Sequence, residues 1–132
     1  MGKIFIGVAL ILIIAFGGYF LFNNLSKTTG NVVAGNEVNT FAITGDHLRF
    51  FIGDAENPDI RVKQGDQVRI EFVSTEGFHD WALDEFGAAT ERVNPGTQTS
   101  IEFVADRKGT FEYYCSVGKH RANGMKGKFV VE

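Results

Sequence analysis

Residues 109–132 read GTFEYYCSVGKHRANGMKGKFVVE, two alternating runs on either side of a loop that holds the rarest side chains of the chain. In that loop Cys115, His120 and Met125 are each separated by four residues. Cys115 is the only cysteine of the chain, and there is just one further methionine. The flanking runs predict strands, because their apolar and polar residues alternate with period two. We therefore expect one end of a β domain to present a thiol, an imidazole and a thioether together.

The same alternation continues upstream of this stretch. Val68, Ile70 and Phe72, for example, alternate with charged residues, and turn sequences such as Asn94-Pro95-Gly96 divide the runs. Strands are expected near residues 39–44, 48–53, 59–63, 67–74, 79–84, 98–104, 110–115 and 127–131. So many short strands in one small domain predict an all-β fold, an antiparallel Greek-key β-sandwich.

Composition restricts the function. The chain has 132 residues, 44% of them hydrophobic, and a net charge of −3, which argues against a general nucleic-acid binder. A single cysteine excludes an internal disulfide framework and any cysteine-rich zinc or iron–sulfur site.

The N-terminal segment differs from the rest. Residues 4–25 carry no charge, and their apolar run matches the roughly 20 residues that span a bilayer core. We expect residues 1–25 to be a single-pass transmembrane helix, with a cleaved signal segment as the alternative. Residues 26–38 would be a flexible linker and residues 39–132 the β domain. Lys3 before the span and Lys27 after it weakly favour a domain on the periplasmic or extracellular side of the cell membrane.

The donor set indicates a redox metal. His79, in GFHDWAL, is the best candidate for a second imidazole, because it belongs to a predicted strand end that can lie beside the 115–125 loop. A thiolate, two imidazoles and a thioether suit copper in both of its oxidation states, whereas zinc rarely takes methionine. Four protein ligands leave no open position, which favours electron transfer over substrate chemistry.

The chain resembles the cupredoxins, the type 1 (blue) copper proteins of the plastocyanin/azurin superfamily, over most of residues 58–132. The Cys-x4-His-x4-Met spacing is similar to that of auracyanin and rusticyanin. The resemblance implies that His79, Cys115 and His120 are the strong ligands of one copper ion and Met125 the weak axial one. Many members of the family have asparagine where this chain has Asp80. That carboxylate would accept hydrogen bonds, for instance from Ser116, and we expect its charge to lower the reduction potential.

The resemblance implies an electron-transfer protein and no enzyme. Together with the apolar N-terminal segment, it predicts a membrane-tethered, monomeric one-electron carrier between redox proteins such as a cytochrome, an oxidase or a reductase. An extracytoplasmic copper carrier or copper sensor is the alternative. A copper enzyme would need further histidines, often one beside the ligand cysteine, where this chain has Tyr114.

Other notable residues carry simpler interpretations. His47 is interpreted as a surface residue and Trp81 as core. Six basic residues are expected around the ligand loop: Arg107, Lys108, Lys119, Arg121, Lys126 and Lys128. Lys119 and Arg121 flank His120 and are the candidates for docking an acidic partner.

Overall fold

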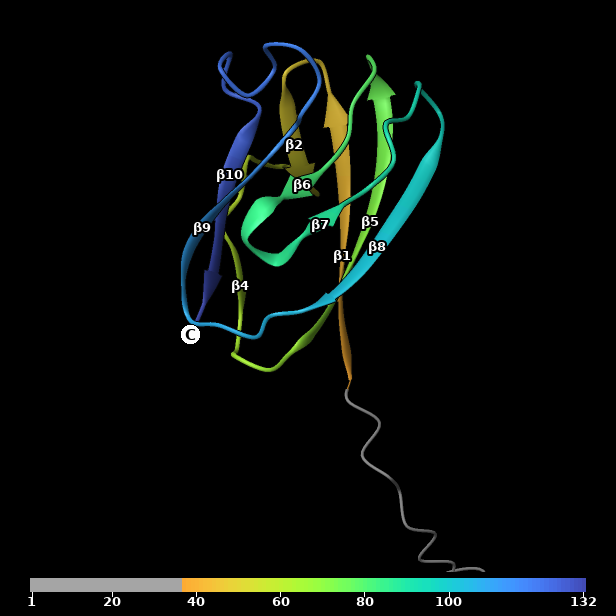
Figure 1. Cartoon of the computed structure of the whole chain (residues 1–132). Helices are drawn as coiled ribbons and strands as arrows, with labels where there is room; N and C mark the ends of the chain where they lie inside the picture. The colour runs from red at the N-terminus through yellow and green to blue at the C-terminus, as the bar shows by residue number, and fades with distance from the viewer. Residues whose placement is uncertain (1–36) are drawn as a thin grey trace, which may run out of the picture. The chain divides into compact units, whose positions relative to one another are not determined.

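The computed structural model describes residues 37–132, which form two facing five-stranded sheets (Figure 1). The first sheet has the order β3-β2-β1-β5-β8 and the second the order β4-β10-β9-β6-β7. The strands of the first sheet are β1 (Val38–Asp46), β2 (Arg49–Ile52), β3 (Ala55–Glu56), β5 (Gln67–Glu76) and β8 (Gln98–Val104). Those of the second sheet are β4 (Ile60–Val62), β6 (Ala82–Leu83), β7 (Ala88–Ala89), β9 (Gly109–Tyr114) and β10 (Lys126–Val131). A short 3-10 helix, η1 (Asp84–Phe86), joins β6 to β7.

The sheets are mixed, so the expectation of a purely antiparallel sandwich is wrong. β1 pairs with β5 in parallel along nearly its whole length, and β10 pairs with β4 in parallel. The remaining strand pairs are antiparallel, among them β5–β8 and β9–β10. The two parallel pairs arise because the chain crosses between the sheets several times, which brings strands far apart in sequence side by side, as in a Greek key.

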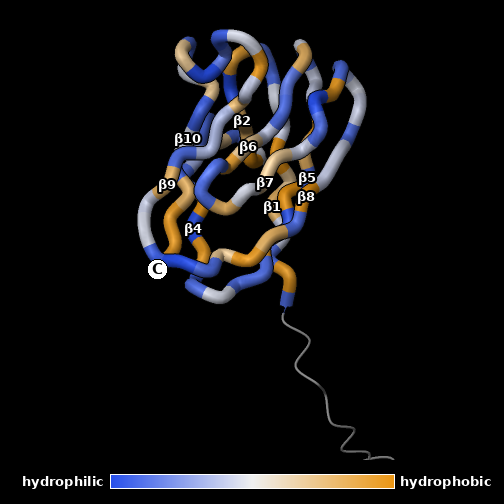
Figure 2. The backbone as a smooth tube through the Cα atoms, in the orientation of Figure 1, coloured by the Kyte–Doolittle hydropathy of each residue, from blue (hydrophilic) through white to orange (hydrophobic). Residues whose placement is uncertain are grey.

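The core lies between the sheets and follows the predicted alternation. Val68, Ile70 and Phe72 of β5 are fully buried and face Phe129 of β10 and Trp81 across the sandwich. Hydrophobic residues follow the strands, whereas most connecting turns are hydrophilic (Figure 2). Burial of these side chains at about 25 cal/mol per Å² of apolar surface is the main term that holds the sheets together.

The predicted strands agree with the structure except around the site. The segment expected as a strand over 79–84 is strand only at β6, and His79 makes an isolated bridge to Val93. The two-residue strands β3 and β7 were not expected from the sequence. β1 begins at Val38, the last residue of the predicted linker.

The predicted membrane anchor and nearly all of the predicted linker lie outside residues 37–132. Within residues 37–132 there is no helix long and apolar enough to cross a membrane. The transmembrane helix therefore stays a prediction from the sequence.

Candidate metal centre

The ligand loop connects β9 to β10 at one pole of the sandwich (Figure 1). Its backbone is folded by its own hydrogen bonds: the amide of His120 donates to the Val117 carbonyl at 3.0 Å, and that of Met125 donates to the His120 carbonyl at 3.0 Å. The Cys115 amide donates to the Met125 carbonyl at 3.1 Å and closes the loop. The three predicted ligands of this segment are thereby held close together.

The second imidazole reaches the same pole from the segment after β5. His79 is fixed by a pair of backbone hydrogen bonds with Val93, 3.2 Å and 2.8 Å long. Its ring nitrogen Nδ1 lies 3.8 Å from the Cys115 sulfur and 3.2 Å from Nδ1 of His120. The Cys115 sulfur lies 3.5 Å from Nδ1 of His120.

These separations fit one ion at the centre of the three donors. Bonds of about 2.0–2.1 Å to nitrogen and about 2.3 Å to sulfur, as found for zinc, place trigonal donors about 3.5–3.8 Å apart. The observed separations of 3.2–3.8 Å are close to this, and all three ligand atoms lie within 4.8 Å of one another. A soft thiolate with two imidazoles in a near-trigonal arrangement is the donor set of type 1 copper.

The His79 ring is oriented by a backbone carbonyl. Its Nε2 lies 2.7 Å from the carbonyl oxygen of Glu76. Because a carbonyl only accepts, Nε2 must carry the proton, and Nδ1 then offers its lone pair to the metal. Burial lowers the pKa of His79, with the Glu76 hydrogen bond acting in the opposite direction. The neutral form that binds a metal is therefore favoured near neutral pH.

The sulfur ligands are fully buried. Burial raises the pKa of the Cys115 thiol, while the backbone N–H groups of Asp80 and Val117 oppose that rise. The thiol proton must leave when a metal binds, so metal binding at this site is expected to release a proton. The Met125 side chain is 0% exposed and belongs to the same loop. Its role as the axial ligand follows from the family resemblance.

Asp80 and Ser116 join the two ligand segments, as expected from the sequence. Oδ1 of Asp80 accepts a 2.7 Å hydrogen bond from the Ser116 amide, and Oδ2 accepts from the Ser116 hydroxyl. Because each residue directly follows a ligand, this bridge fixes the spacing between His79 and Cys115.

Three residues at this pole were missed from the sequence. Arg92 lies 3.6 Å from the Asp80 carboxylate, Phe78 is exposed beside the buried His79, and Gly77 has φ +94°. The place of Phe78 directly before a candidate ligand was a usable signal in the sequence. No signal in the sequence predicted the contact of Arg92, because residues 80 and 92 are brought together only by the pairing of His79 with Val93.

The basic residues are distributed differently from the prediction. Arg107 and Lys108 precede β9, at the pole opposite the ligand loop, so the expectation that they surround it is wrong. Arg121 lies beside the loop but is paired with Glu112 at 2.7 Å and stacks over the Tyr114 ring, 3.8 Å from its centroid. Lys119 is exposed and makes no ion pair in the part of the chain that the structure describes.

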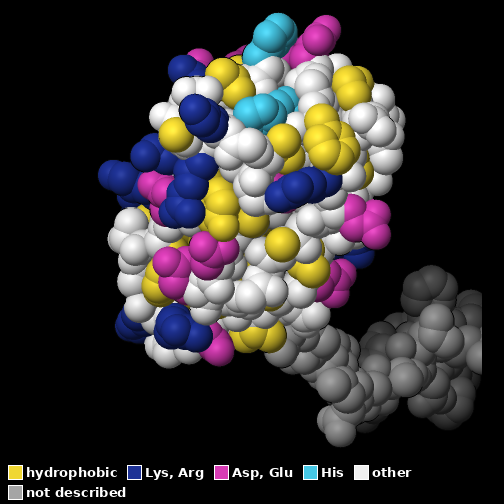
Figure 3. Space-filling view, turned by 45° about the horizontal axis from the view of Figure 1, so that its top comes forward, with side chains coloured by type: hydrophobic (Ala, Val, Ile, Leu, Met, Phe, Trp, Pro, Cys, Tyr) yellow, Lys and Arg dark blue, Asp and Glu magenta, His cyan; other side chains and the backbone are white. Residues whose placement is uncertain are grey.

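Histidine side chains reach the surface at the ligand pole, and basic side chains gather on one flank of it (Figure 3). His120 is partly exposed, whereas His79 is only 1% exposed. His47 is a surface residue in a turn, as expected, and Trp81 belongs to the core. His120 is therefore the ligand through which the site meets the solvent.

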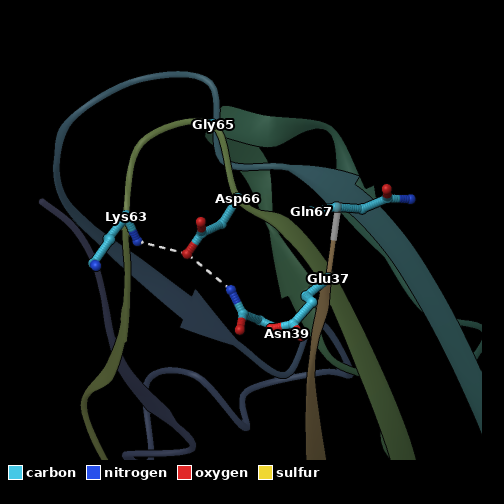
Figure 4. A pocket seen from close by; sticks show the side chains of 6 residues that line it. All are labelled: Glu37, Asn39, Lys63, Gly65, Asp66 and Gln67. Carbon is cyan, nitrogen blue, oxygen red and sulfur yellow. Dashed lines mark hydrogen bonds between the residues drawn. The ribbon is translucent and has the colours of Figure 1, made fainter. Parts of the chain in front are cut away.

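Among residues 37–132 there is one cluster of histidine, cysteine and carboxylate groups with metal-binding geometry, and it is this one. A polar hollow at the opposite pole is lined by Glu37, Asn39, Lys63, Gly65, Asp66 and Gln67 (Figure 4). Its Asp66 carboxylate already accepts hydrogen bonds from the Asn39 amide group at 2.8 Å and the Lys63 backbone at 2.9 Å. The Asp66 carboxylate, the Asn39 amide group and the Lys63 backbone N–H therefore already have hydrogen-bond partners in one another.

Similar proteins are known by sequence and by structure. The copper-containing nitrite reductase of Neisseria meningitidis serogroup A is 36% identical over 93 residues, which cover 62% of this chain and 24% of that protein. The chain thus spans about a quarter of the length of that relative. The auracyanin of Roseiflexus castenholzii has a TM-score of 0.60 at 24% identity, covering 71% of this chain and 97% of that one. Reduced rusticyanin has a TM-score of 0.58 at 22% identity, covering 83% and 93%.

The structural neighbours share the fold, and a family model adds a match by sequence. The model of the copper binding proteins of the plastocyanin/azurin family matches residues 21–132, most of the chain. Together with the cluster of His79, Cys115 and His120, this match identifies the cofactor as copper. The chain belongs to the plastocyanin/azurin family of copper binding proteins.

Proposed function

We propose that this protein is a type 1 copper protein that carries single electrons between redox proteins, tethered to the outer face of a cytoplasmic membrane. The observation that carries the proposal is the convergence of two imidazoles and one thiolate within 4.8 Å at a buried pole, with one imidazole partly exposed. The bound copper supplies a one-electron change between Cu(II) and Cu(I).

The chain's own residues hold a fixed site for that change. His79 and Cys115 are buried and anchored by backbone hydrogen bonds, and Met125 is buried as the axial ligand. Ligands held in place by the fold rearrange little when the charge of the site changes, which favours fast electron transfer. The partly exposed ring of His120 connects the site with the surface.

The first experiment tests the copper site. The purified full-length chain is loaded with Cu(II), and its visible and EPR spectra are recorded. We expect an intense thiolate-to-copper absorption band and a narrow hyperfine coupling, both absent in Cys115→Ser. Spectra without these features in the unaltered protein would overturn the proposal.

The rate of copper exchange distinguishes an electron carrier from a protein that delivers or senses copper. A carrier gives up its metal, whereas the buried, four-ligand site proposed here should retain it. Incubation of the reduced protein with an excess of a Cu(I) chelator is expected to remove copper only over hours. Loss within seconds would favour the carrier. Nitrite reductase activity is not proposed, because the chain spans only about a quarter of that relative.

The membrane tether rests on the apolar residues 4–25. The protein is expected to stay with the membrane fraction after alkaline carbonate washing, and to be reached by protease added to spheroplasts, whose cytoplasmic membrane is intact and exposed. Release by carbonate would contradict the anchor. The protein is proposed to act there as a monomer.

The partner is proposed to be an acidic redox protein, such as a cytochrome, an oxidase or a reductase. Lys119 and Arg121 flank the partly exposed His120. Because Arg121 is paired with Glu112, Lys119 is the main uncompensated charge next to this ligand in the described chain. Opposite charge on the partner would raise the rate of encounter.

A further inference from the structure

The Asp80–Ser116 bridge has a third member that comes from outside both ligand segments. The guanidinium of Arg92 lies with Nε 3.6 Å from Oδ2 of Asp80. Its terminal nitrogen donates to the Ser116 carbonyl at 3.2 Å and to the Ser116 hydroxyl at 3.0 Å. One arginine therefore contacts both partners of the bridge.

Burial makes such a cation necessary. The Asp80 side chain is only 5% exposed, and a buried carboxylate without a compensating charge is strongly destabilising. Ser116 supplies two neutral donors but no charge. Arg92 supplies the charge, and its fork of donors can contact the carboxylate and the serine at once.

Arg92 is held in position by its neighbours in the chain. The next residue, Val93, forms the backbone bridge with His79. Two residues before Arg92, the Thr90 hydroxyl accepts a 3.0 Å hydrogen bond from the Trp81 amide. The backbone of Arg92 is thus tied to both sides of Asp80, although its side chain is 51% exposed.

We propose that Arg92 is a positioning residue of the copper centre: it closes the Asp80–Ser116 bridge and offsets the Asp80 charge, so that the bridge acts on the copper as a neutral group. This rests on the copper site proposed above. It also revises the expectation that Asp80 by itself lowers the reduction potential, because the nearby cation counteracts the carboxylate.

The reduction potential tests whether Arg92 offsets the charge of the Asp80 carboxylate. We expect Arg92→Gln to lower the potential, because the uncompensated carboxylate favours Cu(II), with the ratio of Cu(II) to Cu(I) affinities rising about threefold to tenfold. A tenfold change corresponds to about 59 mV for a one-electron couple. Asp80→Asn should raise the potential, and the double variant should return close to the unaltered protein. Arg92→Lys keeps the charge and should retain most of the original potential.

The matched control is Arg61→Gln. Arg61 is 58% exposed and lies in β4, away from the ligand loop. A shift in Arg92→Gln no larger than in this control would overturn the proposal, and so would an equal shift in Arg92→Lys and Arg92→Gln.

The metal-free protein gives a second, independent measurement. The free energies of unfolding of Asp80→Asn, Arg92→Gln and the double variant form a double-mutant cycle. We expect the double variant to lose clearly less stability than the sum of the single variants. Additive losses would show that the two residues do not act together. Because no copper is present, this result does not depend on the proposed function.

Discussion

The orientation of a single ring determines whether His79 can bind the metal. Its Nε2 is bound to the Glu76 carbonyl, and the chain between the two residues passes through Gly77 at φ +94°. A Cβ atom on Gly77 would lie 2.6 Å from that nitrogen. Glycine is therefore required at position 77 for two reasons: its backbone conformation, and the space that it leaves beside the His79 ring.

We predict that Gly77→Ala weakens copper binding about tenfold or more, because the added methyl group displaces the ring from its carbonyl partner. Copper affinity is measured by competition with a chelator of known affinity. Gly65→Ala is the matched control, since Gly65 has φ +92° but no atom within 4 Å of the added Cβ. Both variants should lose stability through backbone strain, and only Gly77→Ala should lose affinity. Equal affinities would contradict the steric explanation.

The residues with rare donor chemistry were the predictable part of the site. Cys115, His120 and Met125 stood out because such side chains are scarce in the chain, and His79 because it is one of three histidines. The contact between Asp80 and Ser116 was suggested by the family resemblance, because many members have asparagine at the position of Asp80. Arg92 was not predictable, since arginines are common on surfaces and only the tertiary bridge of Val93 to His79 brings it near.

At the scale of elements, alternation predicted which face of each strand is buried but not which strands pair. β5 and β10 show the expected alternation of buried residues. Their parallel neighbours β1 and β4 were unexpected, because a period of two gives the same burial pattern in either direction. The two-residue strands were too short to give any period.

The β2–β3 hairpin supports the end of the ligand loop. Asn57 accepts a 2.9 Å hydrogen bond from the Phe50 amide and donates one of 3.2 Å to the Gly124 carbonyl, directly before Met125. Arg49 donates to the Asn123 carbonyl at 3.2 Å. The first sheet thereby holds the Met125 end of a loop that connects two strands of the second sheet.

We predict that Asn57→Gly lowers the free energy of unfolding by about 1–2 kcal/mol, because it removes two hydrogen bonds. Asn57→Ala should cost about 1 kcal/mol more, because Asn57 has φ +43°, which glycine tolerates better than alanine. Urea unfolding measures both. EPR spectra of the copper-loaded variants should also change, through a looser Met125. Unchanged spectra would mean that the hairpin does not position the axial ligand.

A buried hydroxyl connects β9 with the turn before β4. Tyr113 is fully buried and donates a 2.7 Å hydrogen bond to the Pro58 carbonyl. Burial raises the pKa of Tyr113 well above its usual range. Above about pH 10 the unfolded chain therefore loses this proton while the folded chain keeps it, so the contribution of Tyr113 to stability falls as pH rises.

We predict that Tyr113→Phe destabilises the metal-free protein by about 1–2 kcal/mol near neutral pH, where it leaves the carbonyl unpaired. The difference from the unaltered protein should shrink above about pH 10, since the variant has no phenol to ionise. Unfolding by urea at both pH values measures this difference. A difference independent of pH would show that the phenol titrates alike in both states.

At the scale of the whole described domain, the two poles have different roles. The ligand loop and His79 lie at one pole, and β1 begins at the other, beside the hollow of Figure 4. Lys119 follows β9 at the copper pole, and Lys108 precedes β9 at the opposite pole. Substitution of each lysine therefore tests one pole at a time.

We predict that Lys119→Glu slows oxidation of the reduced protein by ferricyanide about twofold to tenfold at low ionic strength, because the anion then meets a negative charge beside His120. Ferricyanide accepts one electron and becomes ferrocyanide, and stopped-flow absorbance of the blue band follows the reaction. The difference should nearly vanish at about 1 M salt, where the screening length is about 3 Å. Lys108→Glu makes the same change of charge at the opposite pole and should leave the rate almost unaltered. Equal slowing by both variants would mean that net charge, and not a docking surface at His120, controls the encounter.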